Sequence, residues 1–280
     1  MKRIFAAGFA VLLLGAGVWA LRAQIPYPGV KYARGQDVSP TFDGWEANPD
    51  GSFSLYFGYY NRNTEEEIDV PLGEGNHFDR DVDGKKGDDG QPTHFYTGRR
   101  WFVFKTTVPK DWPKDKRLVW TLTSAGRTST AKGWLQPEWE VDQPLITKNA
   151  VVDRSIGIWD PEAPHENDPP KVTGGAAQTI TLPSTAAISV TATDDGVPKP
   201  AAATGRGGRP LGLQVRWFLY RGPGGVKFDP DVSPAVYGKP NVAETKVSFP
   251  APGDYRLRAL ACDGARFTAY DVDVHVNAAK

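Results

Sequence analysis

The chain has 280 residues, with 33 basic and 33 acidic side chains and a formal net charge of zero. This balance provides no general attraction to nucleic acid or to anionic lipid, so no nucleic-acid partner is expected. The length and the 40% share of hydrophobic residues are sufficient for two folded domains, each with its own core.

The first 23 residues read as a secretory signal peptide that forms a short helix. Lys2 and Arg3 precede an uncharged run from Ile4 to Ala20, and cleavage is expected after Ala20 or Ala23. The run is only just long enough to span a bilayer, which favours a cleaved signal. The alternative is an uncleaved anchor helix, and this segment would then be the protein's only membrane contact. The predicted location is periplasmic or extracellular.

Residues 41–73 predict three consecutive antiparallel strands. Asn48-Pro49-Asp50-Gly51 is a turn sequence, because proline presets one backbone angle and glycine accepts a positive one. The strand that follows alternates apolar and other side chains, as a half-buried strand requires. Its inward side chains are Phe53, Leu55, Phe57 and Tyr59.

Further short apolar runs with a period of two, and no segment with helical period, predict an all-β fold. The runs lie at 100–108, 117–123, 127–135, 178–182, 187–193, 213–220, 244–249, 255–262 and 270–276. We therefore expect two antiparallel immunoglobulin-like β-sandwich domains joined by a proline-rich linker. The expected boundaries are 1–23 signal, 24–36 extended leader, 37–143 aromatic-rich sandwich, 144–170 linker and 171–280 second sandwich.

Cys262 is the only cysteine and is expected to be a buried hydrophobe rather than a reactive thiol.

Two stretches resemble known proteins. The segment FPAPGDYRLRALACDG, followed by DVDVHV and ending at Val276, resembles the closing strands of PKD and bacterial Ig-like domains. Where PKD repeats carry a WDFGDG run, this chain has Arg216-Trp217-Phe218-Leu219-Tyr220, so Ig-like is the safer description. In the first domain, NPDG, LYFGYYNRN, EEEIDVPLG and GQPTHF resemble a group of uncharacterised exported bacterial proteins. The resemblances imply export and architecture, and they supply no activity and no site residues.

An acidic loop follows the opening strands. Asp79, Asp81 and Asp83 alternate before Gly84, as in the first half of a calcium-binding loop, and Asp88 or Asp89 would supply a further oxygen. Gly90 stands where the bidentate glutamate of an EF-hand belongs, so a solvated acidic loop explains the same residues. Calcium is the only cofactor that the sequence suggests.

Tyr56 and Tyr60 point away from the face of Phe53 and Phe57, and they are the candidate binding residues. Flat rings with polar edges suit stacking on sugars or anchoring a protein partner. The alternative is that loops or the neighbouring domain cover this face.

Catalytic patterns are sparse, because the chain has no G-x-S-x-G elbow, H-E-x-x-H motif, P-loop or dinucleotide fingerprint. His77 and His94 bracket the acidic loop, which allows either a composite site or ordinary local hydrogen bonds. The leading hypothesis is a non-catalytic binding or scaffold protein of the bacterial cell envelope, with a protein or glycan partner. The alternatives are a calcium-stabilised carbohydrate-binding or adhesion protein and a carboxylate-dependent hydrolase.

Overall fold

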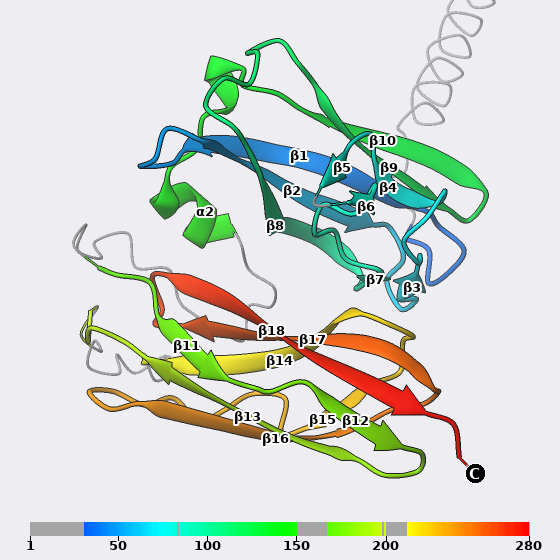
Figure 1. Cartoon of the computed structure of the whole chain (residues 1–280), viewed down its shortest axis with the longest axis vertical. Coiled ribbons are helices and arrows are strands. Elements are labelled where there is room, and N and C mark those ends of the chain that lie inside the picture. Colours follow the sequence, from blue (N-terminus) through cyan, green and yellow to red (C-terminus); the bar gives the residue numbers. More distant parts are fainter. Residues whose placement is uncertain (1–30, 83, 150–166, 198, 200–211, 280) are drawn as a thin grey trace, which may run out of the picture. The chain divides into compact units, whose positions relative to one another are not determined.

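A computed structural model describes residues 31–82, 84–149, 167–197, 199 and 212–279, so the predicted signal helix lies outside the described residues. Residues Ala33–Lys280 form one compact unit. This unit is all-β and contains two sandwiches, with the 3-10 turn η1 (Pro137–Trp139) and the short helix α2 (Gln143–Asn149) as its described helical elements (Figure 1). Within the described part of the chain, no helix is long and apolar enough to cross a membrane.

The first sandwich packs two three-stranded sheets around an aromatic core. Their orders are β1(Val38–Ala47)-β2(Phe53–Asn61)-β8(Gly98–Val108) and β10(Arg127–Gly133)-β9(Leu118–Ser124)-β4(Asn76–Phe78). Two two-stranded sheets complete it: β3(Ile68–Asp69) with β7(His94–Phe95), and β5(Asp81–Val82) with β6(Lys85–Lys86). Phe57 lies at the centre of the core, stacked on Phe104 at 5.7 Å and edge-on to Trp120 at 6.2 Å. Burial of these rings supplies the main driving force for this sandwich.

The turn predicted at Asn48–Gly51 is confirmed. The Asn48 amide donates to the Ser52 carbonyl at 2.8 Å, and Gly51 has φ +86°. The turn joins β1 to β2, and the inward face of Phe53, Leu55, Phe57 and Tyr59 belongs to the core as expected.

The predicted third strand of this meander is wrong. β3 pairs with β7, and the second neighbour of β2 is β8. β8 offers β2 a long apolar partner, with Phe104 opposite Phe57, whereas Glu65–Glu67 make the segment before β3 too acidic to pack on the core. The region expected to be a plain polar loop also contains β4, whose Phe78 is buried against β9.

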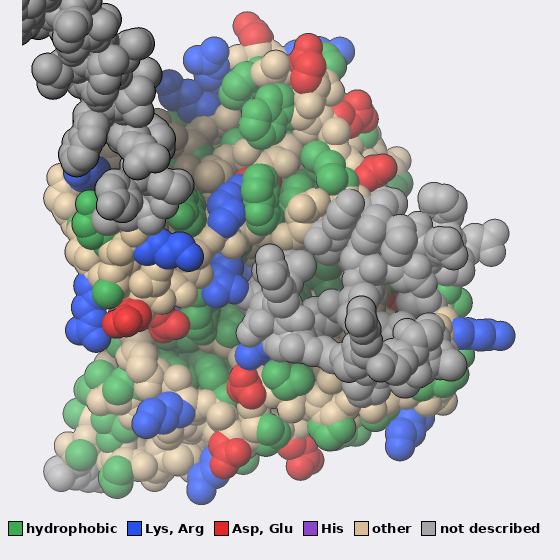
Figure 2. Space-filling view, turned by 180° about the vertical axis from the view of Figure 1, so that it is seen from behind, with side chains coloured by type: hydrophobic (Ala, Val, Ile, Leu, Met, Phe, Trp, Pro, Cys, Tyr) green, Lys and Arg blue, Asp and Glu red, His purple; other side chains and the backbone are tan. Residues whose placement is uncertain are grey.

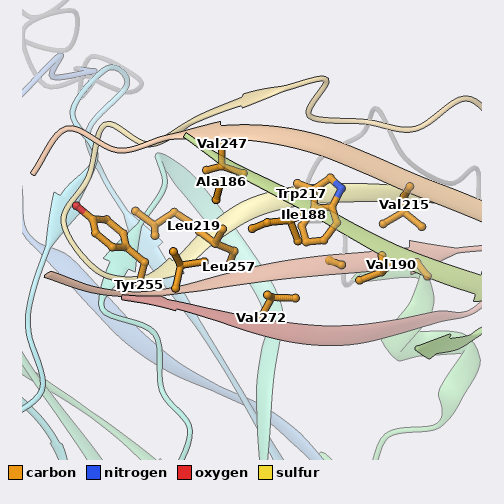
Figure 3. Close-up of a cluster of buried hydrophobic side chains, with 14 of the residues drawn as sticks. Ala186, Ile188, Val190, Val215, Trp217, Leu219, Val247, Tyr255, Leu257 and Val272 are labelled. Atoms are coloured by element: carbon orange, nitrogen blue, oxygen red, sulfur yellow. The ribbon is translucent and has the colours of Figure 1, made fainter. Parts of the chain in front are cut away.

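The second sandwich packs two four-stranded sheets. Their orders are β11(Lys171–Gly174)-β13(Ala186–Thr193)-β16(Asn241–Ser248)-β15(Lys227–Asp229) and β12(Gln178–Thr181)-β18(Phe267–Asn277)-β17(Gly253–Cys262)-β14(Gln214–Arg221). All pairings are antiparallel except β12 with β18. Figure 3 shows Trp217 beside Ile188 between the two sheets, with Leu257 and Tyr255 further along the same core. Cys262 is buried and free, and burial raises its pKa to about 12, as a packing role requires.

The predicted linker 144–170 overlaps the described structure at both of its ends. Helix α2 reaches Asn149, and residues 167–170 already belong to the approach to β11. The residues between them lie outside the described part of the chain. The domain boundaries 37–143 and 171–280 therefore stay a prediction.

Candidate functional site

In the acidic loop, Asp79 and Asp81 each accept a hydrogen bond from a backbone amide. The Asp79 carboxylate accepts from the Val119 amide at 2.9 Å, and the Asp81 carboxylate accepts from the Gly87 amide at 3.1 Å. Each of these aspartates thus caps a nearby backbone group. Among the described residues, no group of three or more His, Cys, Asp or Glu side chains is placed to hold a metal. Asp83 lies outside the described residues, so its predicted role stays untested.

Asp88 is used in a different way, as a contact to the second sandwich. Its carboxylate binds the Arg221 guanidinium through both oxygens, at 2.7 and 3.1 Å. Burial favours the neutral form, but the hydrogen bonds from Arg221 outweigh this and hold the pKa of Asp88 below its ordinary value. The structure therefore presents Asp88 as half of an ion pair.

The two candidate tyrosines differ in exposure. Tyr56 is buried against Phe102 and Ile146, the latter from α2, and its hydroxyl donates to Glu46. Tyr60 is 44% exposed. The sequence allowed two alternatives for this face, exposed tyrosines or a face covered by other parts of the chain. Tyr56 is covered, and of the two tyrosines only Tyr60 is exposed at the surface.

The two loop histidines lie in different environments. His77 is partly buried and its ring contacts the Glu74 carbonyl at 3.0 Å. His94 is buried, and its two ring nitrogens contact Asp69 at 2.6 Å and Glu67 at 3.1 Å. Both nitrogens of His94 are engaged by carboxylates, so this imidazole is not free to act as a general base.

His94 makes stability depend on pH. Burial lowers its pKa, but Asp69 and Glu67 outweigh burial and raise the pKa above 6.5. The folded state therefore holds this proton more tightly than the unfolded chain does, and the stabilisation is complete below the unfolded pKa and is lost as pH rises through the folded pKa. We expect the stability difference between wild type and His94→Gln to be largest near pH 5.5 and to shrink towards about pH 9. Urea unfolding across this range checks it, and a difference that grows with pH would contradict it.

The outer face of the second sandwich carries a row of cross-strand ion pairs, which we call the charge ladder. Inward side chains of β17 and β18 pack in the core, and every second residue points outward. The outward residues meet as His275 with Asp254 at 2.6 Å, Arg256 with Asp273 at 2.8 Å, and Arg258 with Asp271 at 2.7 Å.

One end of the charge ladder is covered by the first sandwich. The Arg258 guanidinium donates to the Val103 carbonyl at 3.1 Å and lies 3.4 Å over the Tyr220 ring. Nearby, the Tyr96 hydroxyl accepts from the Leu219 amide at 2.9 Å. The sandwiches are therefore joined by buried polar contacts as well as by apolar packing.

The other end of the charge ladder is open and forms the base of a groove of about 990 Å³. Its lining includes Asp254, Arg256 and Asp273 of the ladder. On the side of the first sandwich the groove is lined by Asp69, Pro71, Leu72 and Thr93, and on the side of the second by Arg221, Gly222 and Pro223.

The turn after β14 fixes the wall of this groove. Gly222 has φ +123°, and a Cβ added there would lie 2.7 Å from the Tyr255 ring, so only glycine fits. Its amide donates to the Thr93 hydroxyl at 3.0 Å, and the Gly224 amide donates to Asp69 at 2.7 Å. Both sandwiches thus hold the groove in one shape.

Two acids of the groove, Asp69 and Asp273, are held ionised. Hydrogen bonds from Arg256 lower the pKa of Asp273, and those from His94 and Gly224 lower that of Asp69 despite its partial burial. A carboxyl group that donates a proton at neutral pH needs a raised pKa. No carboxyl with a raised pKa lines the groove in the described part of the chain.

Both signs of charge are also interspersed on the molecular surface. Figure 2 shows Lys and Arg side chains among Asp and Glu and hydrophobic ones on one face, without a single-sign region over the described atoms visible there. This agrees with the equal numbers of basic and acidic residues. It favours recognition of a partner through individual charge pairs rather than through long-range electrostatic attraction.

No protein-family model matches the chain, and no curated protein matches it. It is similar in structure to the PKD domain of human KIAA0319, at 19% identity over 44% of this chain and 95% of that chain, with a TM-score of 0.26. Titin domains Z1Z2 in complex with telethonin match at 12% identity over 86% and 98%, with a TM-score of 0.26. The N-terminal periplasmic domain of ScsB from Proteus mirabilis matches at 9% over 83% and 91%, with a TM-score of 0.28.

These TM-scores are too low for the likenesses to carry an argument about function, and the β-sandwich assignment rests on the sheets described above. A PKD domain is among the similar structures, as the segment up to Val276 suggested. The resemblance of the first domain to exported bacterial proteins stays a prediction.

Sequence reasoning missed the groove residues because they come from separate segments. Asp271, Asp273 and His275 form a visible alternation in the sequence, which marks one strand of the ladder. Their partners, and the contribution of Pro71 and Leu72, depend on strand register and on the packing of two sandwiches.

Proposed function

We propose that this chain is an exported, non-catalytic binding protein that takes an extended polypeptide segment of a cell-envelope partner in the groove over the charge ladder. The observation that carries the proposal is the combination of an apolar rim at Pro71, Leu72 and Pro223 with fixed charges of both signs. Protein interfaces combine these features, and paired charges of both signs select a partner segment with complementary side chains. Export is supported by the basic and apolar N-terminal sequence.

The charges available to such a segment differ in exposure. Asp254 is 91% exposed and His275 52%, while Arg221 at 14% is held between Asp88 and the Gln91 carbonyl. A bound segment would therefore meet Asp254 and His275 first and find Arg221 already oriented. Pre-oriented groups lower the entropic cost of association.

The groove does not favour a carboxylate-dependent hydrolase, because Asp69 and Asp273 are both held ionised and neither can donate a proton. It also offers little to a sugar ring, since Tyr255, the aromatic residue in its lining, is 2% exposed.

The glycan alternative rests on a different surface. Tyr60 lies opposite Arg99 in the β2–β8 ladder, and the Arg99 guanidinium stacks 3.7 Å from the centroid of Trp101, which is 44% exposed. Exposed rings of this kind suit sugar stacking. A substitution at Tyr60 therefore distinguishes sugar binding at this surface from peptide binding in the groove.

A displayed library of random peptides, selected on the purified protein, tests the proposal. Binders should lose affinity by about tenfold or more for Asp254→Arg and for Leu72→Asp, because each change alters an exposed groove residue without touching a core. Tyr60→Ser is the matched control on the first sandwich and should leave peptide affinity unchanged.

Two results would overturn the proposal. One is a selection that yields no binders. The other is a set of binders that tolerate both groove variants and are lost with Tyr60→Ser, which would move the site to the Tyr60 and Trp101 surface. A glycan array read with the same three variants reports on the sugar alternative directly.

A further inference from the structure

The charged side chains that line the groove over the charge ladder differ in how far a ligand can reach them. The basic ones are the less exposed, with side-chain fractions of 14% for Arg221, 34% for Arg256 and 52% for His275. The acidic ones are the more exposed, with fractions of 41% for Asp69, 56% for Asp273 and 91% for Asp254. The groove therefore presents its negative charges more openly than its positive ones.

Both arginines of the groove are already paired within the protein. The Arg221 guanidinium binds both oxygens of Asp88 and the Gln91 carbonyl, so three of its five N–H groups are in use. Arg256 binds both oxygens of Asp273, at 2.8 and 3.0 Å. Two-point contacts between arginine and carboxylate are among the strong hydrogen bonds of proteins, and a ligand carboxylate would have to displace them. The groove thus offers little to an acidic ligand.

The two other acids of the groove have histidines as their charged partners. Asp254 contacts Nδ1 of His275 at 2.6 Å, and Asp69 contacts Nδ1 of His94 at 2.6 Å. The second ring nitrogen of His94 contacts Glu67 at 3.1 Å, so two carboxylates share this one imidazole. In the described part of the chain, neither Asp254 nor Asp69 pairs with a lysine or an arginine. Both acids are therefore available to a cationic group of a ligand.

The rest of the groove suits the other parts of a basic side chain. Pro71, Leu72 and Pro223 provide apolar walls, and Leu72 is 38% exposed. Lysine and arginine pack their aliphatic stems on such walls while the charged end remains in a polar environment. The groove volume of about 990 Å³ is at the upper end of the range for ligand pockets, so there is room for more than one side chain.

We propose that the polypeptide segment taken by the groove is basic, and that its lysine or arginine side chains pair with Asp254 and Asp69. The inference rests on the proposed function and adds the chemistry of the partner to it. Complementary charge selects among partners, because a segment with acidic side chains at the same positions would be repelled.

The contact between His275 and Asp254 predicts how pH acts on binding. The hydrogen bond with Asp254 raises the pKa of His275, so at mildly acidic pH the charged imidazole competes with a basic ligand for that carboxylate. The other charged groups that the groove places around His275 are Arg256 on β17 and Asp273 on its own strand, while β12 contributes the uncharged Thr179. As pH rises through the pKa of His275, Asp254 becomes available. Affinity for a basic segment should therefore rise with pH.

Fluorescence-anisotropy titration of the full chain with peptides selected from the random library tests the inference. Peptides that depend on the groove are those weakened by Leu72→Ser, which removes part of the apolar wall without adding a charge. These peptides should carry lysine or arginine, and exchange of the critical basic residue for glutamate should weaken binding by about tenfold or more. Asp254→Arg should bind the glutamate peptide better than the wild type does, because the charges are then exchanged on both sides.

The pH dependence is measured with the same basic peptide. From pH 5.5 to pH 8.5 its affinity should rise by up to about fivefold, the range of an exposed ion pair, and His275→Gln should reduce this dependence. An affinity that falls over this range would contradict the pairing with Asp254.

Asp231→Asn is the matched control for Asp254→Asn. Asp231 is 55% exposed, belongs to the second sandwich and pairs with Arg216, but it is not among the residues that line the groove. Both variants remove one negative charge from the surface, and only Asp254→Asn should weaken the basic peptide. Equal losses in the two variants would overturn the inference, because they would report net charge rather than a site.

The composition of the selected peptides separates the inference from the proposed function. Peptides that depend on the groove but carry no basic residue, or carry mainly aspartate and glutamate, would overturn the inference and leave the proposed function in place. A selection that yields no binders would overturn the proposed function and the inference with it.

Discussion

Replacing Arg258 with alanine should lower the free energy of unfolding by about 3 kcal/mol, because it breaks a largely buried ion pair and a further hydrogen bond at the junction of the two sandwiches. The side chain is 11% exposed and makes two hydrogen bonds to Asp271, at 2.7 and 2.9 Å. It also donates to the Val103 carbonyl and covers the Tyr220 ring. Its loss leaves the carboxylate and the carbonyl without a donor and opens a gap beside an aromatic ring.

Arg256→Ala provides the matched control for this change. Arg256 lies on the same strand and makes the same two-point contact to Asp273, at 2.8 and 3.0 Å. Its side chain is 34% exposed and that of Asp273 is 56% exposed, so this pair contributes about 1 kcal/mol or less. Urea denaturation followed by circular dichroism measures both variants. Equal losses for Arg256 and Arg258 would show that the first sandwich does not cover the ladder.

Asp43→Ala should be similarly damaging, with a loss of about 3 kcal/mol. The Asp43 carboxylate is buried in the first sandwich and accepts from Arg99 at 2.5 Å, from the Phe102 amide at 2.7 Å and from Thr41 at 2.9 Å. Burial raises its pKa in spite of Arg99. Removing the carboxylate leaves a buried amide and a guanidinium without an acceptor.

The backbone around Asp43 amplifies the effect. Phe102 has φ +51°, a conformation that bulky residues rarely adopt, and the hydrogen bond from its amide to Asp43 holds it there. Gly58 makes room for the carboxylate, since a Cβ there would lie 2.3 Å from it. Asp50→Ala, at an exposed turn, should lower the stability far less and is the control in the same unfolding experiment. A small loss for Asp43→Ala would mean that the Phe102 conformation does not depend on it.

The periodicity of the sequence was sufficient to predict the fold class and many of the strands. Phe53, Leu55, Phe57 and Tyr59 predicted one buried face, and Val272, Val274 and Val276 predicted another. The pairing of the strands was harder to predict. Periodicity indicates which side chains of a strand point into the core, but it does not indicate which other strand lies beside it. The pairing of β2 with β8 therefore replaced the expected meander.

The candidate sites were less predictable, for a physical reason. A groove wall such as Leu72 and a ladder residue such as Arg256 are about 180 positions apart in the chain and meet only through the packing of two sandwiches. The alternating aspartates Asp79 and Asp81 resembled a calcium loop, but each accepts a hydrogen bond from a backbone amide, and the Val119 amide that binds Asp79 is distant in the sequence.

Hydrogen–deuterium exchange of the full chain, with and without a peptide selected on it, tests the binding proposal most directly. If the groove over the charge ladder is the site, the peptide should slow amide exchange at Leu72, at Gly222 and in residues 253–256, which line it from both sandwiches. Exchange around Tyr60 and Trp101 should not change. Protection confined to the Tyr60 and Trp101 surface, with none in the groove, would contradict the account.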